Sequence, residues 1–148
     1  MQDIFIQTDD QRAILETVRR FVEDEVTPRS AELDANTDPE ESYSWEIVEK
    51  AHEVGIRQMT LAEEYGGLGT DSLTTSMVIE ELGKGDLGVS VIFAQTLKIA
   101  QIMQAALNEE QKARVLPGFA EDPRGMLGIG ITEPDNASNY FIPHPTPF

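Results

Sequence analysis

The segment LGVSVIFAQTLKIAQIMQAAL, residues 87–107, constrains the fold of this chain more than any other stretch. Its apolar residues surround the axis of a helix on nearly every side, and only Lys98 carries a charge. A helix of this kind usually packs at the centre of a protein, where several neighbouring elements cover it. We therefore expect residues 8–120 to form a helical bundle in which the helix over residues 91–107 is the most buried.

Two capping-box patterns predict where helices begin on either side of that segment. Thr8 and Gln11 are three residues apart, and Asn108 and Gln111 repeat the same spacing. In such a pair, each side chain accepts a hydrogen bond from the backbone N–H of the other residue at a helix N-terminus. A third helix is expected to start at Asp71, a residue type that caps helices well.

Proline and glycine predict where the helices end. Pro28 is expected to end the first helix, with a short second helix over residues 28–36. Gly55 is expected to end a helix over residues 44–55, and the glycines of residues 66–69 exclude a long regular helix there. Pro117 is expected to bend or end the last helix.

The sequence changes in character after Arg124. GMLGIGI, residues 125–131, is a short apolar run rich in glycine, which favours a strand over a helix. A single strand cannot satisfy its own backbone, so it indicates the start of a second structural unit. We expect a helical domain over residues 1–122 and the beginning of a β domain over residues 123–148.

Charge and composition narrow the classes of function. The chain of 148 residues holds 11 Lys and Arg against 27 Asp and Glu, a formal net charge of −16. Such an acidic surface argues against binding to nucleic acid or to an anionic membrane. There is no cysteine, which excludes thiolate chemistry and disulfides and is compatible with the cytoplasm.

Three stretches together resemble the acyl-CoA dehydrogenase family. EEYGGLGTDSLTTSMVIEELGKGD, residues 63–86, is similar to an acidic-aromatic-Gly-Gly loop and the helix that follows it in that family. NEEQKARVLPGFA, residues 108–120, resembles the last helix of the family's N-terminal domain. GIGITEPDNASN, residues 128–139, resembles the strand and loop that begin its middle domain.

The resemblance implies a fold, a reaction and a set of partners. The fold is a mainly α N-terminal bundle followed by the first strand and loop of a β-barrel, so that this chain would be an incomplete part of a longer protein. The family oxidises an acyl-CoA thioester to its trans-2-enoyl form with FAD. Its members pass electrons to an electron-transfer flavoprotein or a similar acceptor, and they form homo-oligomers, either dimers or tetramers.

The same resemblance assigns site residues. Ile129, Ile131, Thr132 and Ser138 would contact FAD, with Thr132 as a donor to the flavin ring, and Ser138 would also reach the CoA portion of the substrate. Phe93, Gln95 and Leu97 would line the acyl cavity, although ordinary core packing explains each of these three as well. The family's catalytic carboxylate has no counterpart in this chain.

Several residues near these positions are expected to have no catalytic role. Glu80 and Glu81 are adjacent on a helix and are interpreted as a solvated face. His52 and His144 have no spacing typical of metal ligands.

The loop after Thr132 departs from the family pattern. Asp135 stands where a glycine is common, and its carboxylate would weaken the binding of a nearby phosphate. This departure keeps open the alternative of a flavin monooxygenase or desulfinase of the same fold. A separate alternative is a non-catalytic subunit that keeps the helical domain as an interaction module.

Overall fold

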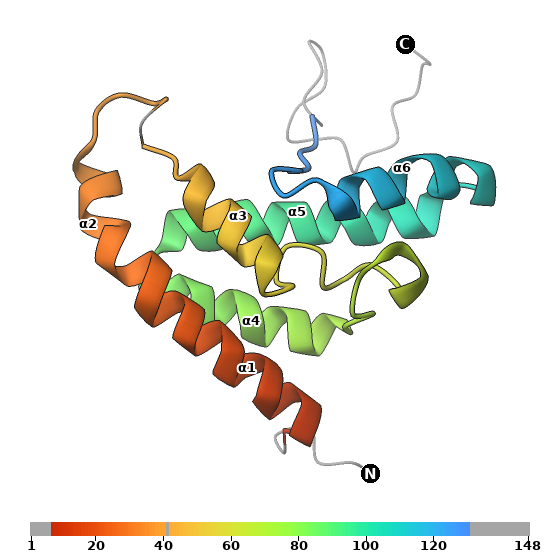
Figure 1. Cartoon of the computed structure of the whole chain (residues 1–148), viewed down its shortest axis with the longest axis horizontal. Coiled ribbons are helices and arrows are strands. Elements are labelled where there is room, and N and C mark those ends of the chain that lie inside the picture. Colours follow the sequence, from red (N-terminus) through yellow and green to blue (C-terminus); the bar gives the residue numbers. More distant parts are fainter. Residues whose placement is uncertain (1–6, 41, 131–148) are drawn as a thin grey trace, which may run out of the picture.

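The computed structural model describes residues 7–40 and 42–130, and within these ranges the regular structure is helical (Figure 1). The α-helices are α1 (Asp9–Phe21), α2 (Thr27–Ala35), α3 (Trp45–Glu53), α4 (Ser72–Gly85), α5 (Leu87–Ala106) and α6 (Glu109–Glu121). A π-helix, η1 (Val22–Val26), joins α1 to α2, and a 3₁₀ turn, η2 (Glu63–Tyr65), precedes the glycine loop. The mainly α architecture predicted from the sequence is confirmed.

The predicted helix starts are confirmed at all three caps. Thr8 and Asn108 each complete a capping box with Gln11 and Gln111, and the Asp71 carboxylate accepts from the Thr74 backbone N–H at 2.7 Å. These caps satisfy N–H groups that have no partner inside the helix.

The predicted short second helix is confirmed as α2, but the prediction that Pro28 marks the end of the first helix is wrong, because α1 ends at Phe21 and the chain stays helical through the proline. Figure 1 shows α1, η1 and α2 as one continuous helical rod. Pro28 lies in the first turn of α2, where a proline needs no backbone donor. The widened π turn before it, in which the Thr27 N–H bonds to the Val22 carbonyl five residues back, lets the chain continue past the proline ring.

Pro117 likewise does not end its helix, because α6 continues through it to Glu121. Gly55, in contrast, ends the helix of α3 as predicted, with a left-handed φ of 79°. The described residues between α2 and α3, residues 36–40 and 42–44, contain no helix.

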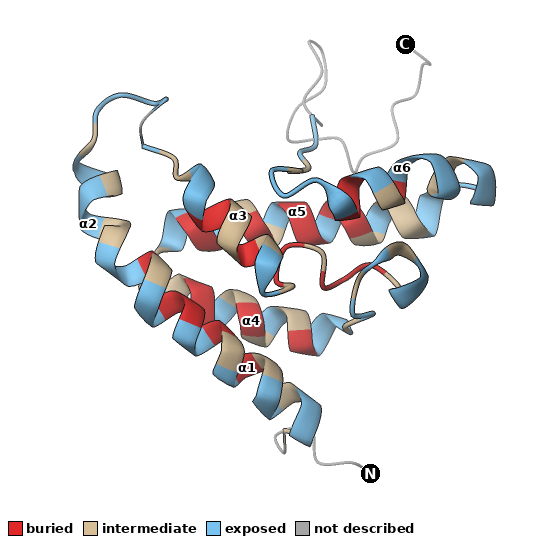
Figure 2. Ribbon diagram, viewed as in Figure 1, coloured by how far each residue is buried: buried red, intermediate tan, exposed pale blue. Residues whose placement is uncertain are grey.

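The main core lies where α1, η1, α3, α4 and α5 meet (Figure 2). Its members are buried aliphatic, aromatic and methionine side chains: Leu15, Val18, Phe21, Val22, Val26, Ile47, Val48, Ala51, Ile56, Met59, Val78, Leu82, Val89, Phe93 and Leu97. Gly85 allows α4 to approach η1 closely, since a Cβ there would lie 2.6 Å from Val22 Cγ1.

The central helix α5 is buried on one face and not all round. Its buried residues are Val89, Ser90, Phe93, Thr96, Leu97, Ile99 and Ala100. On the opposite side Val91 and Ile102 are about half exposed, and no residue after Ala100 is buried in this helix. Helix α5 also starts at Leu87, four residues before the expected start.

By length and composition alone, α5 is the one helix among residues 7–40 and 42–130 that could cross a membrane, with a mean hydropathy of 1.2. A core helix of a soluble protein passes the same test, so the observation is weak evidence for a membrane span. The contacts of its buried face with α4 and the main core account for its apolar character.

A second cluster connects α5 to α6, and comprises Leu61, Ala100, Leu116, Phe119 and Ala120. After α6 the chain turns at Asp122, whose carbonyl accepts from the Gly125 N–H at 3.0 Å. Residues 126–130 are neither helix nor paired strand, so the predicted strand has no ladder partner in the described part of the chain. The division into domains at residue 122 remains a prediction.

Candidate functional site

The three predicted cavity residues on α5 do not share one face. Phe93 is 1% exposed and Leu97 is 0% exposed, and both point into the main core. Gln95 is exposed, because two residues along a helix turn a side chain by about 200°. The structure therefore brings Phe93 and Leu97 together and separates Gln95 from them.

A shallow groove of about 310 Å³ runs between α4 and α5, and Gln95 is not among the residues that line it. Its lining combines hydroxyl, apolar, ammonium and amide side chains: Ser72, Thr75, Ser76, Ile79, Ala94, Lys98 and Gln101. Lys98 is exposed and has no salt bridge with any residue in the described ranges. It is the cation of this groove on an otherwise acidic protein.

Arg57 is fully buried and binds the end of α6. Its guanidinium donates to the carbonyls of Phe119 at 2.9 Å, Ala120 at 3.0 Å and Gly125 at 2.8 Å. It also lies 4.6 Å from the centre of the Phe119 ring, a cation–π contact. Burial lowers the pKa of Arg57, and the nearby Asp122 carboxylate partly opposes that shift.

His52 has a structural contact with this arginine. Its Nδ1 lies 3.0 Å from Arg57 Nη2, and because a guanidinium only donates, the imidazole nitrogen accepts. No group of three or more His, Asp or Glu residues in the described ranges is arranged to hold a metal ion. His144 lies outside those ranges.

A second arginine fixes the turn that follows α6. Arg124 forms an ion pair with Glu49 of α3, and its guanidinium lies 5.5 Å from the centre of the Trp45 ring. Arg57 and Arg124 thus attach residues 119–125 to α3 and to the segment that follows it.

Thr96 holds the next residues against α5. Its buried hydroxyl accepts from the Leu127 N–H at 3.3 Å and lies 3.8 Å from Met126 Sδ, toward which it donates. Met126 packs on the main core and Leu127 on the second cluster. The chain therefore leaves the bundle from a fixed position beside α5.

Ile129 is the one predicted cofactor residue within the described ranges. It is 50% exposed, so its side chain remains available for contact with a further group. Ile131, Thr132 and Ser138 lie outside the described residues, as does Asp135.

The interpretation of Glu80 and Glu81 as a solvated face is right for the first and wrong for the second. Glu80 is exposed, whereas Glu81 is buried and accepts from Arg19 and from Lys84, each at 2.9 Å. The hydrogen bond from Arg19 is the main cause that lowers the pKa of Glu81, and burial opposes it. The two carboxylates share Lys84, whose Nζ lies 3.6 Å from Glu80 and 2.9 Å from Glu81.

Sequence reasoning missed Arg57, Thr96 and Glu81 as residues that organise the site. One signal was available for Arg57, which stands close in sequence to the apolar residues Ile56, Met59 and Leu61. A cation in such a stretch is rarely buried without specific partners. Its carbonyl partners could not be identified from the sequence, since Phe119, Ala120 and Gly125 are more than 60 positions away.

Comparison with known proteins identifies the fold's relatives. Residues 8–122 match the family model "Acyl-CoA dehydrogenase, N-terminal domain". The short-chain specific acyl-CoA dehydrogenase of Clostridium acetobutylicum is 34% identical over 133 residues, which cover 88% of this chain and 34% of that protein. The chain spans about a third of the length of the curated relatives it matches.

Solved structures agree with this match. Butyryl-CoA dehydrogenase from Megasphaera elsdenii is 29% identical with a TM-score of 0.67, covering 79% of this chain and 30% of that one. A chain in the structure of the electron transferring flavoprotein of Acidaminococcus fermentans is 28% identical with a TM-score of 0.76, covering 91% and 34%. Because the family model covers most of the chain and the helical fold agrees, this protein belongs to the acyl-CoA dehydrogenase family.

Proposed function

We propose that this chain forms the N-terminal part of an FAD-dependent dehydrogenase that oxidises an acyl-CoA thioester to the trans-2-enoyl-CoA. The observation that carries the proposal is the match of residues 8–122 to the family's N-terminal domain. The relatives named for short-chain acyl-CoA and butyryl-CoA support the substrate class. The chain covers about a third of those proteins, so the activity belongs to a larger assembly.

The residues proposed to hold FAD are Ile129, Ile131, Thr132 and Ser138. The half-exposed side chain of Ile129 is compatible with contact to a flavin ring. FAD, when bound, supplies the hydride acceptor. The task of this chain's residues is to fix the cofactor loop: Arg57 and Thr96 hold residues 125–127, which lie directly before it.

The exposed side of α5 is proposed to face the substrate. Gln95 and Lys98 are accessible there, and the cation of Lys98 beside the groove suits a ligand that carries phosphates. Phe93 and Leu97 support this surface from the core, and their contribution is to keep the helix in place. The base that removes the α-proton is expected in another part of the protein.

A domain exchange tests this proposal. Residues 8–122 would replace the matching segment of the Clostridium acetobutylicum relative, and dye reduction would be assayed with butyryl-CoA and FAD. We expect substrate-dependent reduction from the chimera and none above background from the 148-residue chain alone. A folded, flavin-loaded chimera without acyl-CoA oxidation would contradict the assignment.

Substitution of Thr132 tests its proposed contact with the flavin. Thr132→Val keeps the side-chain shape and removes the hydroxyl donor, so in the flavin-loaded protein reduction would slow by about 10²-fold if that donor faces developing charge. An unchanged rate and flavin potential would assign Thr132 to the turn alone.

Asp135 is the observation that favours a second candidate function. A carboxylate in place of the common glycine is unfavourable next to a phosphate, and would suit a monooxygenase or desulfinase with a different substrate. Asp135→Gly should tighten a phosphate-bearing ligand under the dehydrogenase proposal. Weaker binding would favour the second function. Absence of flavin binding by a protein that carries residues 129–138 of this chain would favour a non-catalytic subunit.

The partners follow from the same proposal. An electron-transfer flavoprotein or a similar carrier would accept the electrons, in line with the neighbour found in the structure of such a flavoprotein. We also propose a homo-oligomer that works in the cytoplasm, with neither nucleic acid nor membrane as a partner.

A further inference from the structure

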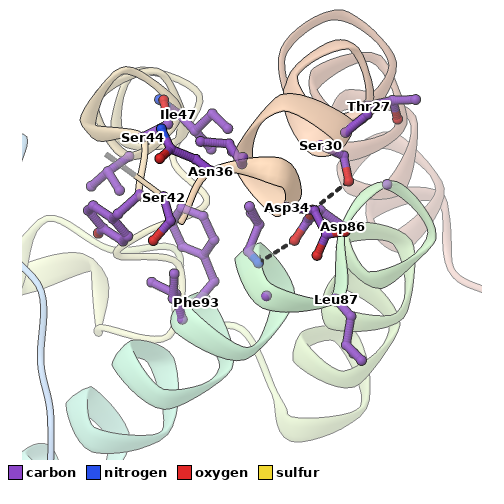
Figure 3. A pocket seen from close by; sticks show the side chains of 18 residues that line it. Thr27, Ser30, Asp34, Asn36, Ser42, Ser44, Ile47, Asp86, Leu87 and Phe93 are labelled. Atoms are coloured by element: carbon purple, nitrogen blue, oxygen red, sulfur yellow. Dashed lines mark hydrogen bonds between the residues drawn. The ribbon is translucent and has the colours of Figure 1, made fainter. Parts of the chain in front are cut away.

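A cavity of about 680 Å³ lies on the side of the bundle formed by α2, α3 and the α4–α5 connection (Figure 3). Residues 42–44, which precede α3, close one side of it. Helix α5 contributes Val89, Ile92 and Phe93 to this cavity, whereas Ala94, Lys98 and Gln101 of the same helix line the groove between α4 and α5. The cavity is therefore separate from the proposed substrate surface, and its volume falls in the range of small-molecule sites.

The floor of this cavity is apolar and rigidly held. Four of its lining side chains belong to the main core and are at most 8% exposed: Ile47, Val48, Val89 and Phe93. Leu33, Tyr43 and Ile92 add partly buried apolar surface around them. A ligand with a hydrocarbon or aromatic portion would bury that portion here and gain the hydrophobic contribution.

The rim carries negative charge alone. Asp34 and Asp86 are the charged residues of the lining, and no lysine, arginine or histidine belongs to it. Figure 3 shows Ser30 directed toward Asp86, whose carboxylate accepts from the Ser30 hydroxyl at 2.5 Å and from the Val89 N–H at 2.9 Å. Both donors are neutral, so the charge of Asp86 is not compensated by an ion pair.

The cations of the surrounding helices are already paired with other carboxylates. Arg29 of α2 binds Glu25 and Glu46, Lys50 of α3 binds the same two, and Lys84 of α4 binds Glu80 and Glu81. Asp34, exposed near the C-terminal end of α2, forms no salt bridge with any residue that the structure describes. Burial raises the pKa of Tyr43, so its phenol keeps its proton and adds no charge.

We propose that this cavity binds an amphipathic organic cation, an alkyl- or arylalkyl-ammonium whose apolar part lies on Phe93, Ile92 and Val48 and whose ammonium group lies near Asp34 and Asp86. The apolar portion of this ligand matches the apolar floor of the cavity, and its positive charge matches the negatively charged rim. The hydroxyls of Ser42 and Thr27 offer further acceptors for ammonium N–H groups. An acyl-CoA or a flavin phosphate, being anionic, is disfavoured here, so this site is chemically distinct from the proposed substrate groove.

Three probes of similar size and different charge test the proposal on the 148-residue chain. Binding of 4-phenylbutylammonium, 4-phenylbutanol and 4-phenylbutyrate would be measured by amide chemical-shift titration. We expect the ammonium to bind most tightly and the carboxylate least, with the largest shifts in residues 42–44 and 87–93. Equal affinity of the ammonium and the alcohol, or shifts confined to other residues, would overturn the proposal.

A matched pair of variants tests the role of the carboxylate. Asp34→Asn removes a rim charge, and Glu32→Gln removes a charge from the same helix at an exposed position outside the lining. Since an exposed ion pair is weak, Asp34→Asn should reduce ammonium affinity by about two- to fivefold and leave the alcohol unchanged. Glu32→Gln should change neither. An equal loss with Glu32→Gln would mean that the general negative surface attracts the probe, and would overturn a specific site.

Discussion

The main core and the α6 junction, residues 119–127, are held to the bundle by different means. The main core is a large set of buried apolar side chains from five elements. The junction packs on a small cluster and relies on polar contacts from Arg57, Arg124 and Thr96 to backbone and side-chain partners. Apolar packing has little directional preference, whereas these polar contacts fix the chain in one position. A fixed position suits a segment that leads to the loop proposed to bind the cofactor.

The largest expected loss of stability comes from placing a charge on the buried face of α5. Ile99 is 7% exposed, and Ile99→Asp would bury a carboxylate without a partner, at a cost of about 3–5 kcal/mol of unfolding free energy. Ile102→Asp is the matched control, because Ile102 is on the same helix and 45% exposed. Urea denaturation of both variants would measure the difference, and equal losses would contradict the two-faced description of α5.

The next largest expected effect comes from a variant that weakens the α6 junction and leaves the main core intact. Arg57→Met keeps much of the side-chain volume but leaves the carbonyls of Phe119, Ala120 and Gly125 without their donor, which should cost about 1–3 kcal/mol. Arg114→Met on the exposed surface of α6 is the control. Hydrogen exchange should rise in residues 116–127 of the Arg57 variant and stay unchanged in α4. Uniform acceleration along the whole chain would show that Arg57 acts as part of the main core.

A smaller effect probes the close contact between α4 and η1. Gly85→Ala would place a methyl group 2.6 Å from Val22 Cγ1, and overpacking of this kind costs about 1–2 kcal/mol. Val22→Ala should relieve the contact, so that the double variant loses less than the sum of the two single losses. Simple additivity in thermal unfolding would mean that the helices move apart to accept the methyl group.

The smallest effect is electrostatic and depends on pH. The pKa of Glu81 lies below its ordinary value of 4.5 in the folded protein, mainly through the hydrogen bond from Arg19. Its contribution to stability is therefore complete above about pH 4.5 and is lost as the pH falls through the lower folded value. Glu81→Gln should cost about 1 kcal/mol at neutral pH and less in acid, with Glu80→Gln as the control. An unchanged loss from neutral to acidic pH would argue against this ion pair.

Local features of the sequence predicted much of the fold. Thr8, Asp71 and Asn108 accept hydrogen bonds from backbone N–H groups within a few residues, and Gly55 ends its helix through its own left-handed φ. The roles of all four could therefore be predicted without knowledge of tertiary contacts. Pro28 was misread because its effect depends on the π turn before it. The burial of α5 was overestimated, because an apolar sequence does not state which elements are present to cover each side.

The candidate site was less predictable because its contacts join distant residues. Arg57 reaches Gly125 across 68 positions and Arg19 reaches Glu81 across 62, and no local pattern encodes such pairs. The exposure of Gln95 and the burial of Phe93 and Leu97 could have been separated by helical periodicity alone. Resemblance to the family grouped these three residues as one lining, whereas the geometry of a helix divides them.

Native-state hydrogen exchange of the unmodified chain tests the central claim most directly, namely that an apolar core and a polar junction are separate units of stability. We expect amides in the buried stretches of α4 and α5 to exchange only through global unfolding, and amides of residues 116–127 to exchange through a local opening of lower free energy. One common opening free energy for both regions, with the same dependence on denaturant, would contradict the account.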